Sequence, residues 1–283
     1  MTCIWAAELT PAAGEAAEIV DEQVNVAGSI STAAVIDMAP DEIVEGACRT
    51  EYASLDTVFE RVIGLGHICT TKGQINNYFS PGAPLMKTKK GHADLFDWLF
   101  IYDYNLLANA LSNKLVDIFE KDDFIKTARI ENKAVFNKRY NMQWNHLFDN
   151  RIGAYSAHNT SNWNQYVSLE YFHDHFDETR SKIDHLREKF ISAKNQKTLY
   201  IISHPQTGPT FETLVRVRDS LTTIRQGDKQ FAILFVPNSQ TYEGAENIIV
   251  REAIKLKDGW NGANPARWHE ILSEFKFTPD IWT

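Results

Sequence analysis

Residues 198–237 read TLYIISHPQTGPTFETLVRVRDSLTTIRQGDKQFAILFVP. Two continuously apolar runs, at 198–203 and 231–237, flank a stretch from about 211 to 225 that has the length of a helix. Continuous apolar runs are typical of strands that are covered on both faces. The pattern therefore predicts a strand, a helix and a second strand parallel to the first, joined by a right-handed crossover.

The flanking sequence extends this unit. A further strand is predicted at 247–254, and a closing helix from Pro265 to Phe275 has its proline at the first turn. Val62, Ile63 and Leu65 indicate a short buried strand near the start of the domain. We expect a three-layer α/β domain over residues 58–283, with a mainly parallel sheet flanked by helices. A papain-like α+β fold is the alternative.

Two helices are predicted between these strands. Apolar residues at three-and-four spacing indicate one helical face through 104–124 and another through 171–190. In the second helix, Glu178 and Lys182 have the spacing of an i, i+4 ion pair. His173, Asp174 and His175 lack the fuller ligand set that zinc needs, and Asp174 serves equally well as an N-cap, so we predict no metal site.

Acidic residues are concentrated at the N-terminal end. Residues 1–57 contain eleven acidic residues and one basic residue, whereas the whole chain has a net charge of −8. The remainder is therefore slightly basic, and the acidity of the whole chain says little about its surface. An acidic, alanine-rich segment with few aromatic residues favours a poorly ordered leader at 1–57.

The amino-acid composition is typical of a globular protein without membrane-spanning segments. Hydrophobic residues make up 43% and charged residues 23%, and no apolar run approaches the roughly 18 residues that span a bilayer. The N-terminus lacks the features of a secretory signal, and Cys3, Cys48 and Cys69 form neither a disulfide framework nor a zinc spacing. We expect a cytoplasmic protein that binds no membrane, nucleic acid or cofactor.

Cys69 is the candidate nucleophile. Gly64 and Gly66 allow a sharp turn after the first strand, and Cys69 follows at the first turn of a helix that continues through residues 74–78. The free N–H groups of a helix N-terminus lower the pKa of a thiol and hold an oxyanion during acyl transfer. The alternative is that Cys69 is a small buried hydrophobic residue.

Three histidines are candidates for its base. His158 is followed by Asn159, whose amide oxygen would orient the imidazole ring. His204 lies at the carboxyl end of the strand at 198–203, where open α/β sheets bind ligands. His269 lies in the last predicted helix, and a hydrolase of another kind would place it, rather than His158, beside Cys69.

Several motifs in order resemble a known family. They are GLGHIC (64–69), FDWL (96–99), the His158–Asn159 pair, the LYIIS strand (199–203) and WNGANPARW (260–268). Together they resemble the bacterial family described as papain-like cysteine peptidases. The resemblance implies that Cys69 is the family's cysteine, that Asp97 and Trp98 are its aspartate-tryptophan pair, and that His158 is its histidine. Gly64 replaces the family's serine, and Asn159 replaces its aspartate.

The sequence thus predicts a thiol-dependent hydrolase or acyltransferase acting on a peptide, acyl or glycan substrate. Its predicted catalytic residues are Cys69, His158, Asn159 and Asp97. The residues expected to contact substrate are His67, Trp98, His204, Trp260 and His269. The alternative is a non-catalytic module that binds a glycan or nucleotide at the loops 204–209 and 237–244, although no glycine-rich phosphate fingerprint is present.

Overall fold

The computed structural model describes residues 51–66, 69–81, 93–97, 99–126, 135–144, 169–204, 208–237, 244–252 and 264–281; for residues 69–70, 126, 135 and 169–171 it describes the backbone alone. The helices are α1 (Cys69–Phe79), α2 (Tyr104–Ser112), α3 (Leu169–Asp174), α4 (Phe176–Ser192), α5 (Phe211–Ile224) and α6 (Pro265–Ser273). The strands are β1 (Val58–Phe59), β2 (Arg61–Gly64), β3 (Leu99–Ile101), β4 (Phe124–Lys126), β5 (Val135–Asn137), β6 (Met142–Trp144), β7 (Thr198–His204), β8 (Phe231–Pro237), β9 (Ile248–Val250) and β10 (Lys276–Phe277). This mixture of helices and strands confirms the α/β class.

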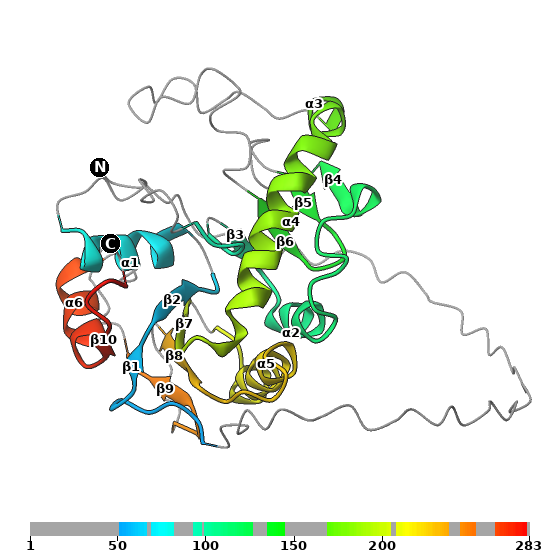
Figure 1. Cartoon of the computed structure of the whole chain (residues 1–283). Coiled ribbons are helices and arrows are strands. Elements are labelled where there is room, and N and C mark those ends of the chain that lie inside the picture. Colours follow the sequence, from blue (N-terminus) through cyan, green and yellow to red (C-terminus); the bar gives the residue numbers. More distant parts are fainter. Residues whose placement is uncertain are drawn as a thin grey trace, which may run out of the picture. The chain divides into compact units, whose positions relative to one another are not determined.

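Four parallel strands form the sheet predicted from residues 198–237. Its order is β2-β7-β8-β9, with Ile63 paired to Tyr200 and Ile201 paired to Leu234. α5 connects β7 to β8 (Figure 1). The predicted strand-helix-strand unit and the strand that follows it are therefore confirmed.

Successive residues of the central strands enter two different hydrophobic clusters. Tyr200 and Ile202 belong to a cluster shared with α2, α4 and α5, whereas Leu199 and Ile201 belong to a cluster shared with α1 and α6. Side chains alternate between the two faces of a strand, so both faces of β7 are covered. This double burial explains why the strand reads as a continuous apolar run.

A second sheet was not predicted. It is antiparallel, with the order β3-β6-β5-β4, so the expectation of a mainly parallel sheet describes only part of the domain. The helix predicted through 104–124 is also too long, because α2 ends at Ser112. Lys114 and Leu115 then adopt positive φ angles of 52° and 57°, which turn the chain out of the helix while Leu115 stays buried.

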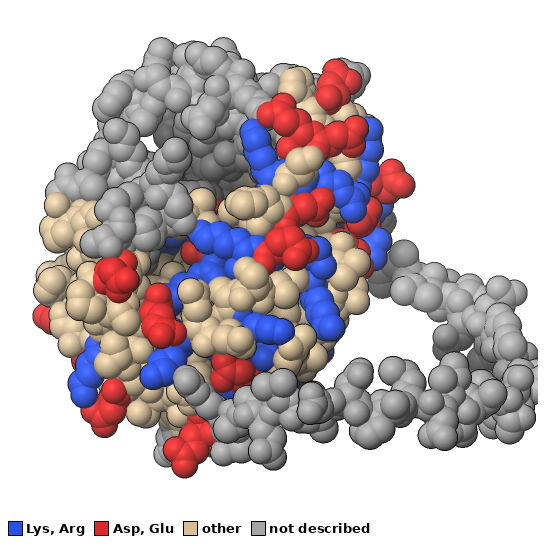
Figure 2. All heavy atoms as spheres, viewed as in Figure 1, with Lys and Arg blue, Asp and Glu red and all other residues tan. Residues whose placement is uncertain are grey.

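The α4 helix carries the predicted ion pair, with Lys182 Nζ 3.2 Å from Glu178 Oε1. Arg180 also donates a hydrogen bond to Glu120, and Figure 2 shows Lys and Arg side chains lying beside Asp and Glu on the face in view.

The N-cap of α4 is His175 and Asp174 ends α3, so the predicted Asp174 cap is wrong. Among the described residues, no His, Cys, Asp and Glu side chains form a metal-binding group.

Residues 51–57, which the sequence assigned to the acidic leader, include contacts with the domain. Ala53 is buried and its N–H donates to the carbonyl of Lys229, while the Tyr52 ring packs edge-on against Phe231. The packing of the domain therefore includes residues before Val58. Residues 1–50 lie outside the described part of the chain.

Among the residues that the structure describes, no helix combines the length and apolarity needed to cross a bilayer.

Candidate functional site

The junction between β2 and α1 is built around a glycine. Gly66 has a φ of +81°, and a Cβ there would lie 2.9 Å from Ile101 Cδ1. Only glycine combines this conformation with this close approach. The Leu65 N–H donates to the Ile201 carbonyl at 2.7 Å, so the neighbouring strand β7 holds the turn in place.

Cys69 is the first residue of α1, as predicted. It follows the carboxyl end of β2, on the edge of the sheet where open α/β folds bind ligands. The first turn of α1 contains no acidic residue that would oppose a thiolate. The backbone N–H groups that start the helix have no intrahelical acceptors, which makes this end favourable for negative charge.

Residues 71–76 of α1 are buried although most of them are polar. Thr71, Lys72, Gln74 and Asn76 are each at most 3% exposed. Thr71 Oγ1 donates to the Gly66 carbonyl at 2.9 Å and lies 2.5 Å from Ser203 Oγ at the end of β7. Thr71 therefore ties the helix that begins at Cys69 to the strand turn and to the neighbouring strand.

A cluster of charged side chains surrounds Lys72, the residue that follows Thr71 in α1. Lys72 Nζ is 2.9 Å from Asp97 Oδ2 and 4.0 Å from Asp94 Oδ2. Asp94 also pairs with Arg61 of β2, and Lys189 of α4 lies 3.9 Å from it. The cluster joins the start of α1 to the turn that precedes β3.

Burial is the largest influence on Asp97. It raises the pKa of this carboxyl to about 6, against the lowering effect of Lys72. Asp97 does not cap α2, the helix that follows it in the chain. The N-cap of α2 is Asp103, whose carboxylate accepts the N–H groups of residues 105 and 106.

His204 ends β7, the strand beside β2. The Gly208 N–H donates to His204 Nδ1 at 3.1 Å, which requires a neutral ring with its proton on Nε2. Gly208 has a φ of +63°, so this short loop also depends on glycine. His204 thus lies at the carboxyl ends of the parallel strands, as the start of α1 does. Its Nε2 nitrogen can donate a hydrogen bond.

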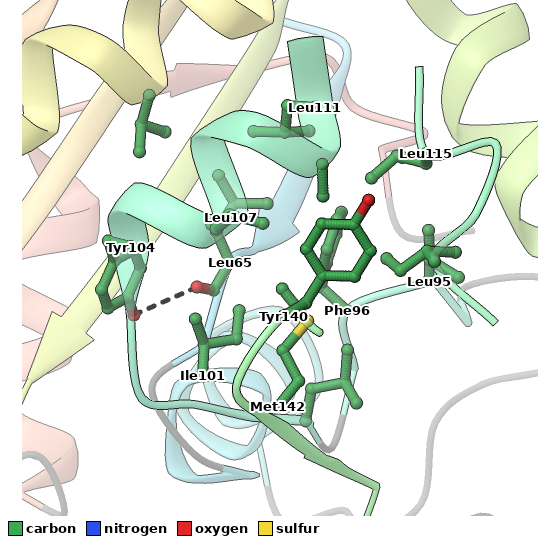
Figure 3. Close-up of a cluster of buried hydrophobic side chains, with 14 of the residues drawn as sticks. Leu65, Leu95, Phe96, Ile101, Tyr104, Leu107, Leu111, Leu115, Tyr140 and Met142 are labelled. Carbon is green, nitrogen blue, oxygen red and sulfur yellow. Dashed lines mark hydrogen bonds between the residues drawn. The ribbon is translucent and has the colours of Figure 1, made fainter. Parts of the chain in front are cut away.

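Tyr104 contacts both the end of β2 and His204. The Tyr104 hydroxyl donates to the Leu65 carbonyl at 3.2 Å, as Figure 3 shows, and its ring lies 6.4 Å from that of His204. Burial raises the pKa of Tyr104, so this hydroxyl stays protonated. It is a fixed donor within the core that carries the strand end.

His269 lies at the other end of α1. Its ring packs 5.1 Å from that of Tyr78, in the last turn of the helix. Position 78 is nine residues after position 69, which corresponds to about 14 Å along a helix axis. The alternative in which His269 serves Cys69 as a base therefore finds no support in this arrangement.

The remaining predicted site residues lie outside the described part of the chain: His67, Trp98, His158, Asn159 and Trp260. Sequence reasoning also missed Lys72, Thr71 and Ser203. One signal was present, since a stretch of Thr, Lys, Gln and Asn directly after a buried strand is too polar for an ordinary core helix. Such a helix is buried only where its polar groups find partners.

Comparison of the sequence with protein-family models and curated proteins, and of the structure with solved structures, finds no match. The resemblance to cysteine peptidases therefore stays a prediction from the motifs.

Proposed function

We propose that the protein is a thiol-dependent hydrolase or acyltransferase with Cys69 as its nucleophile. The observation that carries this proposal is the position of Cys69 as the first residue of α1, which follows the carboxyl end of β2 and buries polar side chains between residues 71 and 76. This position supplies backbone N–H groups to a thiolate and to an oxyanion. A cysteine with a purely structural role needs neither.

The reaction has two steps. The Cys69 sulfur attacks a carbonyl carbon, and its proton passes to His158, which gives it to the leaving amine or alcohol. A water molecule or an acceptor alcohol or amine then attacks the thioester and releases the acyl group. The backbone N–H groups of α1 stabilise the oxyanion in both steps.

His204 has a different role in this proposal. Its Nδ1 accepts the Gly208 N–H, so the neutral ring carries its proton on Nε2. A neutral donor at the sheet edge suits a substrate carbonyl or the oxyanion formed from it. We therefore assign His204 to substrate binding and the base to His158.

The proposed setting is a three-layer domain of a cytoplasmic protein. The shared clusters of β7 with helices on alternate sides support this layering. The proposed substrate is a peptide, an acyl group or a glycan, because nothing in the site selects among these.

The test is the pH dependence of Cys69 alkylation by iodoacetamide in the full chain carrying Cys3→Ser and Cys48→Ser. We expect a thiolate that forms well below the ordinary thiol value of about 8.5. His158→Ala should raise the apparent pKa of the thiol, whereas His204→Ala should leave it nearly in place. An ordinary pKa of the Cys69 thiol that is the same in the parent chain and in His158→Ala would contradict the proposal and favour the binding module.

A further inference from the structure

Lys72 of α1 lies between two buried carboxylates. Its Nζ is 2.9 Å from Asp97 Oδ2 and 4.0 Å from Asp94 Oδ2. The three side chains are buried, with at most 5% of their surface exposed. Opposite charges attract each other more strongly in such a setting than in water. A small movement of the ammonium group would thus exchange one carboxylate partner for the other.

The two carboxylates differ in their surroundings. Asp94 faces cations from three elements, namely Arg61 of β2, Lys72 of α1 and Lys189 of α4. Of the basic side chains described, Lys72 alone forms an ion pair with Asp97. Asp97 Oδ1 is also buried, and no residue in the described ranges donates a hydrogen bond to it. Asp97 is therefore the carboxyl group that burial favours in its neutral form.

The backbone that carries the two carboxylates is held in place. The Asp97 N–H donates to the Asp94 carbonyl at 3.1 Å, and the Asp94 N–H donates to Asp97 Oδ2 at 2.9 Å. Phe96, which lies between them in the turn, is buried and packs edge-on against Phe190 of α4. The lysine side chain, in contrast, is a flexible four-carbon stem. An exchange of partners is therefore a movement of Lys72 rather than of the turn.

We propose that these residues form a pH-sensitive switch, in which Lys72 pairs with Asp97 when that carboxyl is ionised and moves to Asp94 when Asp97 takes up a proton from solvent. The proposal does not depend on the proposed function. Asp97 leads into β3, whereas Asp94 is tied to β2 and α4 by its ion pairs with Arg61 and Lys189. The proton on Asp97 thus decides which of these elements Lys72 links to α1.

The switch operates in the weakly acidic to neutral range. Burial raises the pKa of Asp97 to about 6, against the lowering effect of Lys72, and the charge of Asp94 raises it further. Once Asp97 is neutral, it no longer attracts the ammonium group as a charge, whereas Asp94 keeps its ion pair with Arg61. The balance of attraction on Lys72 then favours Asp94.

The experiment is a titration of the full chain between pH 4 and 8, followed by NMR of labelled aspartate and lysine. The Asp97 carboxyl carbon reports its protonation, the Lys72 ammonium nitrogen reports its partner, and the Asp94 carboxyl carbon reports the arrival of Lys72. We expect all three signals to change with one midpoint near pH 6. This measurement on the parent chain requires no substitution.

Two variants test the exchange itself. Lys72→Met should raise the Asp97 midpoint by on the order of 1 pH unit, because it removes the nearby positive charge. It should also abolish most of the response of the Asp94 carbon. Asp94→Asn removes the like charge and the second partner of Lys72, so the Asp97 midpoint should fall by about 1 pH unit.

Asp123→Asn is the matched control, because it removes another buried carboxylate, one that pairs with Arg139. It should leave the midpoint of Asp97 in place. An Asp97 carboxyl that titrates near the ordinary value of about 3.9 would overturn the proposal. Asp94 and Lys72 signals that do not follow the Asp97 midpoint would also overturn it, as would an Asp94 response that persists in Lys72→Met.

Discussion

At the scale of single residues, the two glycines before Cys69 have different importance. Gly66 has a positive φ and no room for a Cβ, whereas a Cβ at Gly64 would meet its nearest neighbour, Thr71 Cγ2, at an ordinary 3.4 Å. We expect Gly66→Ala to lower the free energy of unfolding by about 1–3 kcal/mol. Gly64→Ala should change it far less. Urea unfolding of both variants checks this, and equal losses would contradict the strained turn.

The raised pKa of Asp97 predicts a pH dependence of stability. The folded protein holds this proton up to about pH 6, whereas an unfolded aspartate releases it near 3.9. The stabilisation is therefore present below about pH 4 and is lost as the pH rises through 6, by on the order of 2–3 kcal/mol.

Asp97→Asn lacks this titration, so the parent chain should lose stability relative to the variant between pH 4 and 6. Urea unfolding of both proteins at several pH values in this range measures the difference, and the other titrating groups cancel between them. A parent advantage that grows with pH would mean that attraction to Lys72 outweighs the burial of Asp97.

At the scale of elements, the hydroxyl of Thr71 is the link between α1, the β2 turn and β7. Thr71→Val keeps the shape of the side chain and removes its bonds to the Gly66 carbonyl and Ser203. We expect a loss of about 1–3 kcal/mol of unfolding free energy, together with slower alkylation of Cys69.

Thr71→Ser is the matched control, because it keeps the hydroxyl and removes only a methyl group. It should retain most of the alkylation rate. If the serine variant reacts as slowly as the valine variant, packing of the methyl group rather than the hydrogen bonds holds the junction.

Sequence predicted well those elements whose formation has one dominant physical cause. The β7 and β8 runs are apolar because both faces are buried, and α6 begins where Asn264 caps a helix with Pro265 at its first turn. The end of α2 was missed because the apolar spacing continues to Phe119 through a turn. Burial of Leu115 outside the helix imitates a helical face, so periodicity alone does not mark the turn.

At the scale of the whole molecule, sequence predicted those features of the site that depend on local sequence and missed those that depend on contacts between distant residues. A strand followed by glycines and a cysteine places Cys69 at a helix start from local sequence alone. The pairing of Lys72 with Asp97 joins residues far apart in the chain, and a single sequence holds no record of such contacts. His204 was placed correctly at a strand end, but the Gly208 bond that fixes its tautomer depends on loop geometry.

The boundary of the domain gives the last prediction. Residues 52 and 53 pack against the domain through the Tyr52 ring and the Ala53 N–H. We expect deletion of residues 1–50 to leave the melting temperature nearly unchanged. Deletion of residues 1–57 should lower it by several degrees, because it removes a buried alanine and an aromatic contact with Phe231. Thermal unfolding of the two truncated chains measures the difference. A large drop in the shorter deletion would place part of the domain core within the acidic segment, whereas no drop in the longer one would show that the 52–53 contacts contribute little.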